Sequence, residues 1–268
     1  VVVGGGPTGV ELSGALAELK MHILPTDYPE LDSDQIHIRL IEGSPNLLGT
    51  MSEQASSSAK AFLEKIGVQV YTNVRVEGYD GHLIRLSNGE SINTKNVLWS
   101  AGIKGAILAG IPSESVVRGR IKVDTYNSVV GLDNIFAIGD VAAMVTDKYP
   151  NGHPCVAPVA IQQGKTLAMN LLKMINHRKP EAFVYFDKGS MATVGRNKAV
   201  VDIGRIRFQG VFAWFVWMFV HLMSLVGFRN KVVTFVNWVW SYFSYDRGIR
   251  LIIRPFNRSS MTEDTTIK

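Results

Sequence analysis

The stretch Val1-Val2-Val3-Gly4-Gly5-Gly6-Pro7-Thr8-Gly9 decides the fold class of this chain. An unbroken apolar run is typical of a buried parallel strand. Here it leads straight into the spacing Gly4-x-Gly6-x-x-Gly9, after which a helix is expected over residues 10–20. In such a motif the first glycine permits a tight turn, the second lets the backbone approach a pyrophosphate, and the third lets the helix pack on the strand. The helix N-terminus also favours phosphate. The stretch therefore predicts an α/β fold with a Rossmann-type dinucleotide-binding domain, in which Gly4, Gly6, Pro7, Thr8 and Gly9 contact the cofactor.

A second strand is expected over residues 36–41, and it ends at Glu42. A carboxylate at that point accepts hydrogen bonds from the ribose hydroxyls of an adenosine and repels a 2′-phosphate, so Glu42 favours NADH as the dinucleotide. The alternative is that Glu42 is only a solvated acid at a strand end. Residues 21–35 are rich in Pro, Asp and Glu and are expected to form an inserted loop.

The remainder of the first hundred residues alternates between helical and strand patterns. A helix is expected over residues 52–66, followed by a strand over 68–71. Short strands at 74–79, 83–86 and 91–92 are separated by Asp80-Gly81 and Asn88-Gly89, which are strong hairpin signals. A buried strand is expected at 96–99. The pattern predicts a βαβ unit with an antiparallel hairpin excursion.

Composition narrows the class of protein further. The chain has 268 residues, of which 46% are hydrophobic and only 19% are charged, against about 25% in soluble domains, so part of the surface is expected to lie outside water. A single cysteine, Cys155, excludes an internal disulfide framework and any Cys-rich zinc or iron–sulfur site, and no metal site is expected from the six histidines. The chain begins at Val1, inside a strand, and we expect it to be the C-terminal portion of a longer protein.

The positive charge is concentrated near the C-terminus. Residues 188–258 carry eleven Lys or Arg and two Asp, although the net charge of the whole chain is +5. Such a segment implies a local negative partner, for which nucleic acid and anionic lipid are the candidates. The aromatic and apolar sequence that lies between the basic residues favours lipid, and no nucleic acid is expected.

Residues 208–228 contain no charged side chain and are long enough to span a membrane. Gln209, His221 and Ser224 would form a polar stripe on one helix, and the aromatic residues lie mid-run rather than at the ends, both of which argue against a span. The next run, 232–245, is too short to span. The flanking cations are Arg205, Arg207, Arg229, Lys231, Arg247 and Arg250. The segment therefore predicts amphipathic helices lying in the interface of an anionic membrane. A spanning helix and a soluble or oligomeric interface are the alternatives.

Several motifs, taken in their order along the chain, resemble the type II, non-proton-pumping NADH:quinone oxidoreductases, which are flavoproteins with two dinucleotide-binding domains. The expected strand Asn134-Ile135-Phe136-Ala137-Ile138 ending in Gly139-Asp140 resembles their second flavin motif, and Trp99-Ser100-Ala101-Gly102 resembles the crossover between their domains. Residues 157–164 resemble their quinone-site helix, 191–200 their C-terminal hairpin, and 208–245 their membrane-anchoring helices.

This resemblance implies a function and a set of roles. Hydride passes from NADH to FAD, and two electrons then pass to a membrane quinone. Ala101, Gly102, Gly139 and Asp140 are expected to contact FAD. Glu11 corresponds to a family Glu near the nicotinamide, although an acid in a first helical turn is also favoured by the helix dipole. Gln162 and Gln163 are expected to offer amide donors to the quinone, whereas Pro158 stands where the family usually has a further Gln.

The resemblance also implies the organisation of the chain. We expect an NAD-binding domain over residues 1–98, the C-terminal part of an FAD-binding domain over 99–180, and a hairpin with membrane-anchoring helices over 181–268. The flavin half with its own glycine motif is not in this sequence. A peripheral location on the cytoplasmic face of a bacterial inner membrane, or on an equivalent organellar membrane, is expected, and a homodimer through the C-terminal segment is a candidate. The alternatives are a related flavoprotein with another acceptor, of the sulfide:quinone or ferredoxin reductase type, and a non-catalytic membrane-bound NADH-binding module.

Overall fold

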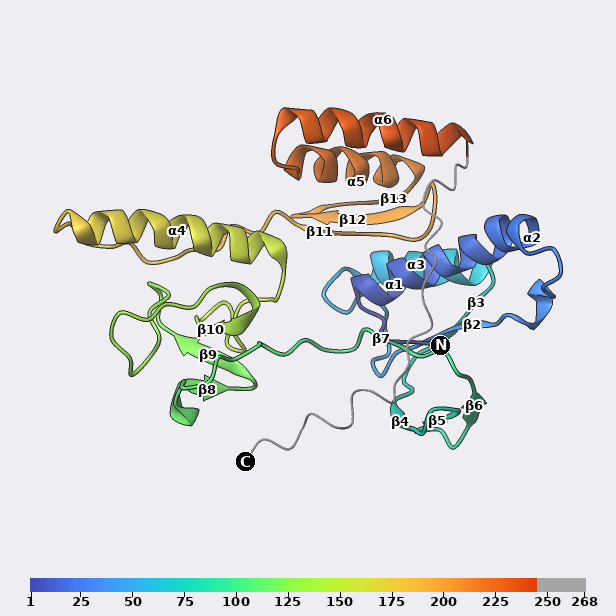
Figure 1. The fold of residues 1–268 in the computed structure, drawn as a ribbon, viewed down its shortest axis with the longest axis horizontal. Helices are drawn as coiled ribbons and strands as arrows, with labels where there is room; N and C mark the ends of the chain where they lie inside the picture. The colour runs from blue at the N-terminus through green and yellow to red at the C-terminus, as the bar shows by residue number, and fades with distance from the viewer. Residues whose placement is uncertain (245–268) are drawn as a thin grey trace. The chain divides into compact units, whose positions relative to one another are not determined.

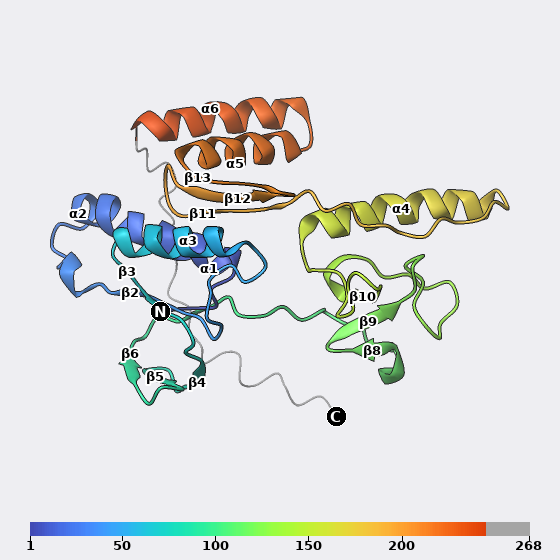
Figure 2. The ribbon, with the colours of Figure 1, turned by 180° about the vertical axis from the view of Figure 1, so that it is seen from behind.

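The computed structural model describes residues 1–244. They belong to two compact units, of which the first comprises residues 1–217 and the second begins at Met218. The first unit has a mixed α/β fold, and Figures 1 and 2 show its elements from opposite sides. Its described residues form four small sheets, each with three or four strands.

A four-stranded parallel sheet begins the chain, with the strand order β3-β2-β1-β7. Its strands are β1 (Val2–Val3), β2 (Ile38–Ile41), β3 (Val68–Tyr71) and β7 (Leu98–Trp99). The helices α1 (Pro7–Glu18) and α3 (Glu53–Lys65) cover one face of this sheet, and Ser52 caps α3 by accepting from the Ala55 amide at 3.2 Å. Proline is favoured in the first turn of a helix, so α1 begins at Pro7, three residues earlier than predicted.

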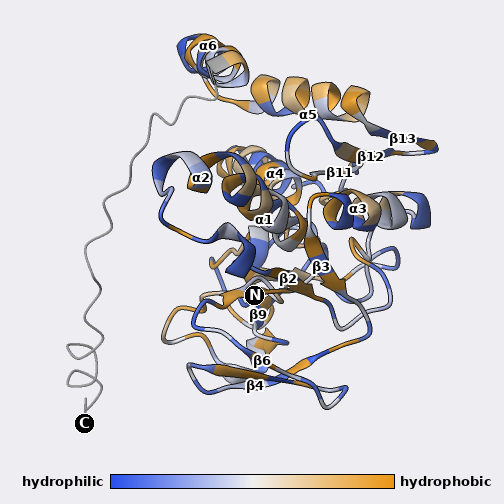
Figure 3. Cartoon of the chain, turned by 90° about the vertical axis from the view of Figure 1, so that its right-hand side faces the viewer, coloured by the Kyte–Doolittle hydropathy of each residue, from blue (hydrophilic) through white to orange (hydrophobic). Residues whose placement is uncertain are grey.

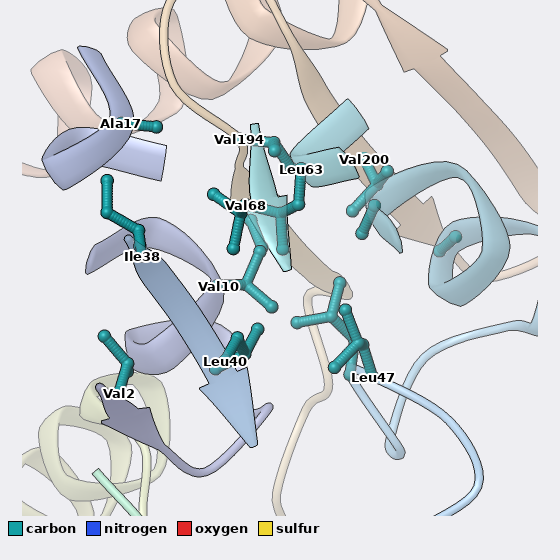
Figure 4. Packing of buried hydrophobic residues seen from close by; sticks show 14 residues of the cluster. Val2, Val10, Ala17, Ile38, Leu40, Leu47, Leu63, Val68, Val194 and Val200 are labelled. Atoms are coloured by element: carbon teal, nitrogen blue, oxygen red, sulfur yellow. The ribbon is translucent and has the colours of Figure 1, made fainter. Parts of the chain in front are cut away.

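The main core lies between this sheet and a second, antiparallel sheet. That sheet consists of β11 (Ser190–Thr193), β12 (Ala199–Ile203) and β13 (Ile206–Gly210). Helices α1 and α3 form the layer between the two sheets, so that Val2 and Leu40 from below and Val200 from above are buried in the same cluster (Figure 4). Residues from far apart in the sequence therefore share one core.

The other face of the parallel sheet is covered by a small meander of β4 (Val76–Tyr79), β5 (Leu83–Leu86) and β6 (Ser91–Asn93). Leu40 packs with the helices whereas Ile41 packs with Ile84 and Ile92 of the meander, as expected because successive side chains of a strand point to opposite faces. The predicted βαβ unit with a hairpin excursion is confirmed.

Residues 103–187 form a region with its own apolar cluster. It contains β8 (Val116–Val117), β9 (Arg120–Val123), β10 (Ala142–Met144), the long helix α4 (Ala157–Ile175), and the 3₁₀ turns η3 (Ser113–Ser115) and η4 (Gly139–Val141). Ile121, Val123, Met144 and Phe183 are buried together there.

Two helices follow β13, namely α5 (Val211–Ser224) and α6 (Phe228–Ser244). At the start of α5, Ala213 is buried against Ala199 and Val201 of β12. Figure 3 shows that most of α5 is hydrophobic, whereas α6 carries both hydrophilic and hydrophobic residues. Within residues 1–244, no helix combines the length and apolar character that crossing a membrane requires. The described part of the chain does not include Tyr245, where the second apolar run was expected to end. It also excludes Arg247, Arg250 and the basic residues that follow them.

Two predictions about secondary structure are wrong. Residues 21–35 are not all loop, because the helix continues through a π-helical turn, η1 (Leu19–Ile23), into α2 (Leu24–Asp27), with a further 3₁₀ turn, η2 (Ser33–Gln35). Pro25 is compatible with this continuation because it lies in the first turn of α2. Residues 134–138 are not a strand, since their one ladder contact is an isolated bridge from Phe136 to Ser128.

Two further expectations fail at the level of side chains. The strand β7 pairs with β1 but lies at the sheet edge, and Trp99 is 62% exposed rather than buried. Gln209 lies in β13 and accepts a hydrogen bond from Gln54 of α3 at 3.1 Å, so it does not share a helix face with His221 and Ser224. The predicted polar stripe therefore loses one of its three members.

Candidate functional site

The glycine loop is built by backbone packed directly on backbone. Gly4 has a φ of +106°, and a Cβ there would lie 2.8 Å from the amide nitrogen of Ala101. A Cβ on Gly9 would lie 1.8 Å from the carbonyl oxygen of Gly4. Gly6, in contrast, has open space where its Cβ would be. The loop therefore excludes side chains at its first and third glycines and leaves room beside the second, where a pyrophosphate would approach.

The crossover segment supports this loop from the neighbouring strand. The Ser100 hydroxyl donates to the carbonyl oxygens of Val3 and Gly4 at 2.8 and 3.1 Å, and its backbone N–H donates to Val3 at 2.8 Å. Gly102 has a φ of +92° and open space where its Cβ would be. The structure thus brings Ala101 into contact with Gly4. Sequence reasoning missed Ser100, although a small hydroxyl residue directly after a parallel strand was a usable signal.

Glu42 follows β2 at the same edge of the sheet. Its Oε2 accepts the Gly5 N–H at 2.5 Å and its Oε1 accepts the Ser44 N–H at 2.6 Å. Burial alone would raise the pKa of this carboxyl, but hydrogen bonds from the Ser44 side chain and from the backbone of Gly5, Ser44 and Gly43 lower it below its ordinary value. The carboxylate is therefore charged at neutral pH, and it also fixes the glycine loop.

Glu11 lies in the second turn of α1 and not in the first as expected, because the helix begins at Pro7, and it contacts the C-terminal sheet. Its Oε1 accepts from the Thr193 backbone N–H at 3.2 Å and from the Thr193 hydroxyl at 3.4 Å. One face of α1 approaches the same sheet so closely that a Cβ on Gly14 would lie 2.6 Å from the Gly195 nitrogen. Glu18 accepts from the Arg196 N–H. The helix that carries the dinucleotide loop is thus joined to the β11–β12 turn, and Gly14 and Thr193 are contacts that the sequence did not reveal.

The Gly139–Asp140 turn is held by α4. Gly139 has a φ of +68°, and its N–H donates to Oε1 of Gln163 at 2.7 Å. The Gln163 side chain is only 1% exposed, and a Cβ on Gly139 would lie 3.1 Å from Cβ of Ala160. Asp140 itself is exposed. Gln163 therefore supports the turn that presents Asp140.

Gln162 has partners on a different face of α4. Its Nε2 donates to the Phe186 carbonyl and its Oε1 accepts the Phe186 N–H, both at 3.0 Å. Eight residues further along, Asn170 makes the same pair of contacts with the backbone of Glu181, at 2.8 and 2.9 Å. These two carboxamides hold the segment 181–186 along the helix. Sequence reasoning missed Asn170, for which the Gln/Asn spacing of eight residues was the signal.

His153 is buried among aromatic rings next to this region. Its Nδ1 lies 3.1 Å from the Met144 carbonyl oxygen, and its ring is 4.5 Å from that of Tyr149 and 5.4 Å from that of Phe183. Burial, with smaller contributions from the charges of Arg120 and Lys148, lowers the pKa of His153, against the opposing effect of the Met144 contact. This environment, buried among aromatic rings, indicates a structural role for His153.

These residues fit the two expected cofactors to different degrees. The open space at Gly6, the uncapped N-terminus of α1 and the charged Glu42 fit the pyrophosphate and adenosine ribose of NADH. For FAD the chain offers the exposed carboxylate of Asp140, presented by a turn that a side chain on Gly139 would distort. That carboxylate fits a contact with a ribityl hydroxyl.

Comparison with known proteins decides the family. Residues 1–164 match the family model of the pyridine nucleotide-disulphide oxidoreductases, and residues 188–244 match the model of the NDH2 C-terminal domain. The chain belongs to the pyridine nucleotide-disulphide oxidoreductase family. Relatives that the chain resembles include the type II NADH:quinone oxidoreductase Ndh of Mycobacterium tuberculosis, 36% identical over 92% of this chain and 55% of that protein. The internal alternative NAD(P)H-ubiquinone oxidoreductase A1 of Arabidopsis thaliana is 32% identical over 94% of this chain and 52% of that protein.

A solved structure has the same fold. The structure of NDH2 from Plasmodium falciparum, solved in complex with NADH, superposes with a TM-score of 0.83 over 93% of this chain and 66% of that chain, at 21% identity. The predicted resemblance to the type II enzymes is thus confirmed. The chain spans about half the length of the curated relatives it matches.

Proposed function

We propose that this chain supplies the NADH site and the acceptor-side elements of a type II NADH:quinone oxidoreductase, with NADH and FAD as its cofactors. The observation that carries the proposal is the glycine loop, which combines excluded side chains at Gly4 and Gly9 with open space at Gly6 and a charged Glu42 beside it. The match of residues 188–244 to the NDH2 C-terminal domain favours quinone over the acceptors of other flavoproteins of this family.

The residues of this chain bind and orient the reactants. The amides of the loop hold the pyrophosphate, and Glu42 holds the adenosine ribose. Glu11, fixed by Thr193, stands on the helix that begins at the loop and is proposed to line the nicotinamide end. Asp140 orients the flavin through its ribityl chain. The flavin, when bound, supplies the two-electron chemistry that accepts hydride and reduces the quinone.

The test uses the complete protein product of the gene. A yellow protein that NADH bleaches under anaerobic conditions, and that added quinone reoxidises, supports the proposal. A protein without flavin that nevertheless binds NADH would instead favour the non-catalytic NADH-binding module. Reoxidation by ferredoxin or by sulfur compounds but not by quinone would favour the related reductases.

Selection of NADH by Glu42 has its own test. Glu42→Ala removes a carboxylate that repels a 2′-phosphate, so the ratio of NADH to NADPH efficiency, kcat/KM, should narrow. The ratio should stay unchanged in Asp80→Ala, because that exposed carboxylate lies on the distal turn between β4 and β5. A constant ratio in Glu42→Ala would remove Glu42 from the adenosine site.

We also propose that α5 and α6 lie in the interface of an anionic membrane. The helix α6 carries an apolar stripe at helical spacing, all of it exposed. The stripe consists of Phe228, Val232, Phe235, Val236, Val239, Trp240 and Phe243. Asn230, Thr234 and Asn237 lie on the opposite side of this helix, and Arg229 and Lys231 lie in its first turn. An apolar stripe accompanied by cations fits a peripheral location.

A truncation after Trp217 is the sharpest test of this membrane proposal. It keeps β13 and the buried Ala213, so the first compact unit retains its core. The truncated protein should leave the membrane fraction while NADH oxidation with a soluble dye survives. High salt should weaken the binding of the intact protein to anionic vesicles. An intact protein that alkaline carbonate cannot extract would instead favour a spanning helix.

The domain organisation belongs to the same proposal. Residues 1–98 would form the NAD-binding domain, 99–180 the C-terminal part of the FAD-binding domain, and 181–268 the hairpin and anchor. The contact of Glu11 with Thr193 at the end of β11, and the approach of Gly14 to Gly195 in the β11–β12 turn, support a functional link between the first and last of these parts. A homodimer through the C-terminal segment would be tested by sedimentation of the detergent-solubilised protein before and after the truncation.

A further inference from the structure

The adenosine end of the parallel sheet contains a cation that the proposed function does not use. The segments that follow β2 and β3 are joined at the carboxyl edge of the sheet. The Glu42 N–H donates to the Tyr71 carbonyl at 2.8 Å, the Val74 N–H donates to the Glu42 carbonyl at 3.0 Å, and the Asn73 N–H donates to the Ser44 carbonyl at 3.0 Å. Because of these contacts, residues 72–75 lie beside Glu42, at the edge where a Rossmann-type sheet binds the adenosine ribose.

The side chain of Arg75 lies over the backbone of Gly43, the residue directly after Glu42. A Cβ on Gly43 would lie 3.1 Å from Cγ of Arg75 and 3.6 Å from its Nε. The backbone of Arg75 is fixed on both sides by Ser87, since its N–H donates to the Ser87 hydroxyl at 3.0 Å and its carbonyl accepts the Ser87 N–H at 2.9 Å. The absence of a side chain at Gly43 is what allows the guanidinium stem to approach.

Arg75 is exposed, and its guanidinium is available to bind an anion. Among residues 1–244 it forms no ion pair, and the carboxylate oxygens of Glu42 accept from Gly5 and Ser44 instead. A planar guanidinium binds phosphate oxygens through paired N–H donors. A cation with this geometry beside the ribose-binding carboxylate has the chemistry that a 2′-phosphate requires.

We infer that Arg75 is a specificity residue of the adenosine site, and that it receives the 2′-phosphate of a phosphorylated nicotinamide dinucleotide, so that the site accepts NADPH as a second substrate. This inference rests on the proposed dinucleotide site. Glu42 repels the 2′-phosphate and Arg75 attracts it, so NADH remains preferred while NADPH is not excluded. Removal of the Glu42 side chain should therefore shift the preference toward NADPH, and removal of the Arg75 side chain should shift it toward NADH.

The experiment measures the binding of two fragments to the complete protein by calorimetry. Adenosine 2′,5′-bisphosphate and adenosine 5′-monophosphate differ only in the 2′-phosphate. Arg75→Ala should weaken binding of the bisphosphate about ten-fold, the lower end for a hydrogen bond to a charged group at an exposed site. Binding of the monophosphate should change by less than about two-fold, and Arg75→Lys should keep part of the affinity because it retains the charge without the paired donors.

A matched control and a double variant sharpen this result. Arg85→Ala removes another exposed arginine, which lies on β5 and pairs with Asp80. This substitution should leave both affinities unchanged. Glu42→Ala should strengthen bisphosphate binding when Arg75 is present and should do so less when Arg75 is also Ala. Thermal midpoints are measured for each variant, and the same-charge Arg75→Lys remains informative if Arg75→Ala is unstable.

The outcomes separate this inference from the proposed function. Selective loss of bisphosphate binding in Arg75→Ala supports the inference. An equal change for both fragments, no change for either, or a wild-type protein that binds the monophosphate but not the bisphosphate overturns it while leaving the dinucleotide site intact. Failure of the wild-type protein to bind either fragment or NADH overturns the proposed function and the inference together.

Discussion

Two glycine turns of this chain are held in place in different ways. At the dinucleotide loop, Gly4 and Gly9 are fixed by backbone atoms that leave no room for a Cβ. At the turn before Asp140, Gly139 is fixed by the side chain of Gln163 and by contact with Ala160. In the first turn, close approach of backbone to backbone, including that of Ala101, excludes side chains. The second turn depends on side chains of a helix that lies more than twenty residues further along the chain.

The largest effect is expected for Gly9→Ala, which changes the turn that is fixed by backbone atoms. The new Cβ would meet the Gly4 carbonyl at 1.8 Å, and a backbone atom cannot move aside as a flexible side chain can. We expect the variant to lose about 2–4 kcal/mol of unfolding free energy and to lose NADH binding. Thermal unfolding and an NADH titration measure the two effects.

Gly6→Ala is the control for this prediction. Its Cβ enters open space and its φ of −70° suits alanine, so stability should change little while NADH affinity falls because the methyl group stands where the pyrophosphate approaches. Equal stabilities for Gly9→Ala and Gly6→Ala would show that the close backbone packing is not what fixes the loop.

The second prediction concerns the side chain that supports the other turn. Gln163→Leu leaves the Gly139 N–H buried without its acceptor, which costs about 1–3 kcal/mol of unfolding free energy. Flavin affinity of the complete protein should fall as well, because Asp140 follows Gly139 directly. Gln163→Glu restores an acceptor of the same shape, and it should recover more flavin affinity than Gln163→Leu does. Unchanged flavin affinity in Gln163→Leu would separate Gln163 from the Asp140 site.

The same contrast explains what the sequence could predict. The glycine loop, the hairpins at Asp80-Gly81 and Asn88-Gly89, and the helix expected over residues 52–66 follow from preferences of nearby residues, and the structure has each of them. The strand expected over residues 36–41 is present as β2, Ile38–Ile41.

Interactions between distant segments were not predictable in this way. A carboxamide on a helix can bind a quinone or a neighbouring backbone equally well, and only the position of Phe186 determines what Gln162 contacts. Gln209 looked like part of a helix because the apolar run continues through it, yet pairing with β12 makes it part of a strand. Residues 134–138 have a strand pattern but lie beside a loop that offers one bridge.

A third prediction uses the buried histidine near the second turn. Burial lowers the pKa of His153 in the folded state, so the unfolded chain takes up this proton first as the pH falls. The contribution of His153 to the free energy of unfolding is therefore fully present above about pH 6.5, the ordinary pKa of histidine. Below that pH the free energy of unfolding falls by at most about 1.4 kcal/mol per pH unit because of this residue. Denaturant unfolding between pH 5 and 8 measures this slope. His153→Phe should flatten it, whereas His37→Gln, at an exposed position, should leave it unchanged.

The smallest expected effect separates the two glutamines of α4. Gln162 remains a candidate quinone ligand, since one N–H of its amide and the second lone pair of its oxygen are not used by the Phe186 contacts. If Gln162 orients quinone, Gln162→Leu removes a hydrogen bond worth about 0.5–1.5 kcal/mol, and quinone turnover slows several-fold while NADH reduces the flavin at its normal rate. If Gln162 serves only to hold residues 181–186, the same variant lowers the free energy of unfolding by a similar amount and leaves both half-reactions unchanged.

Asn170→Leu is the matched control, because it removes the equivalent pair of hydrogen bonds to the Glu181 backbone elsewhere on the helix. Stopped-flow measurement of both half-reactions in the two variants therefore distinguishes quinone binding from a structural role. A slower quinone step in Gln162→Leu alone supports quinone binding by Gln162. Equal behaviour of the two variants contradicts it.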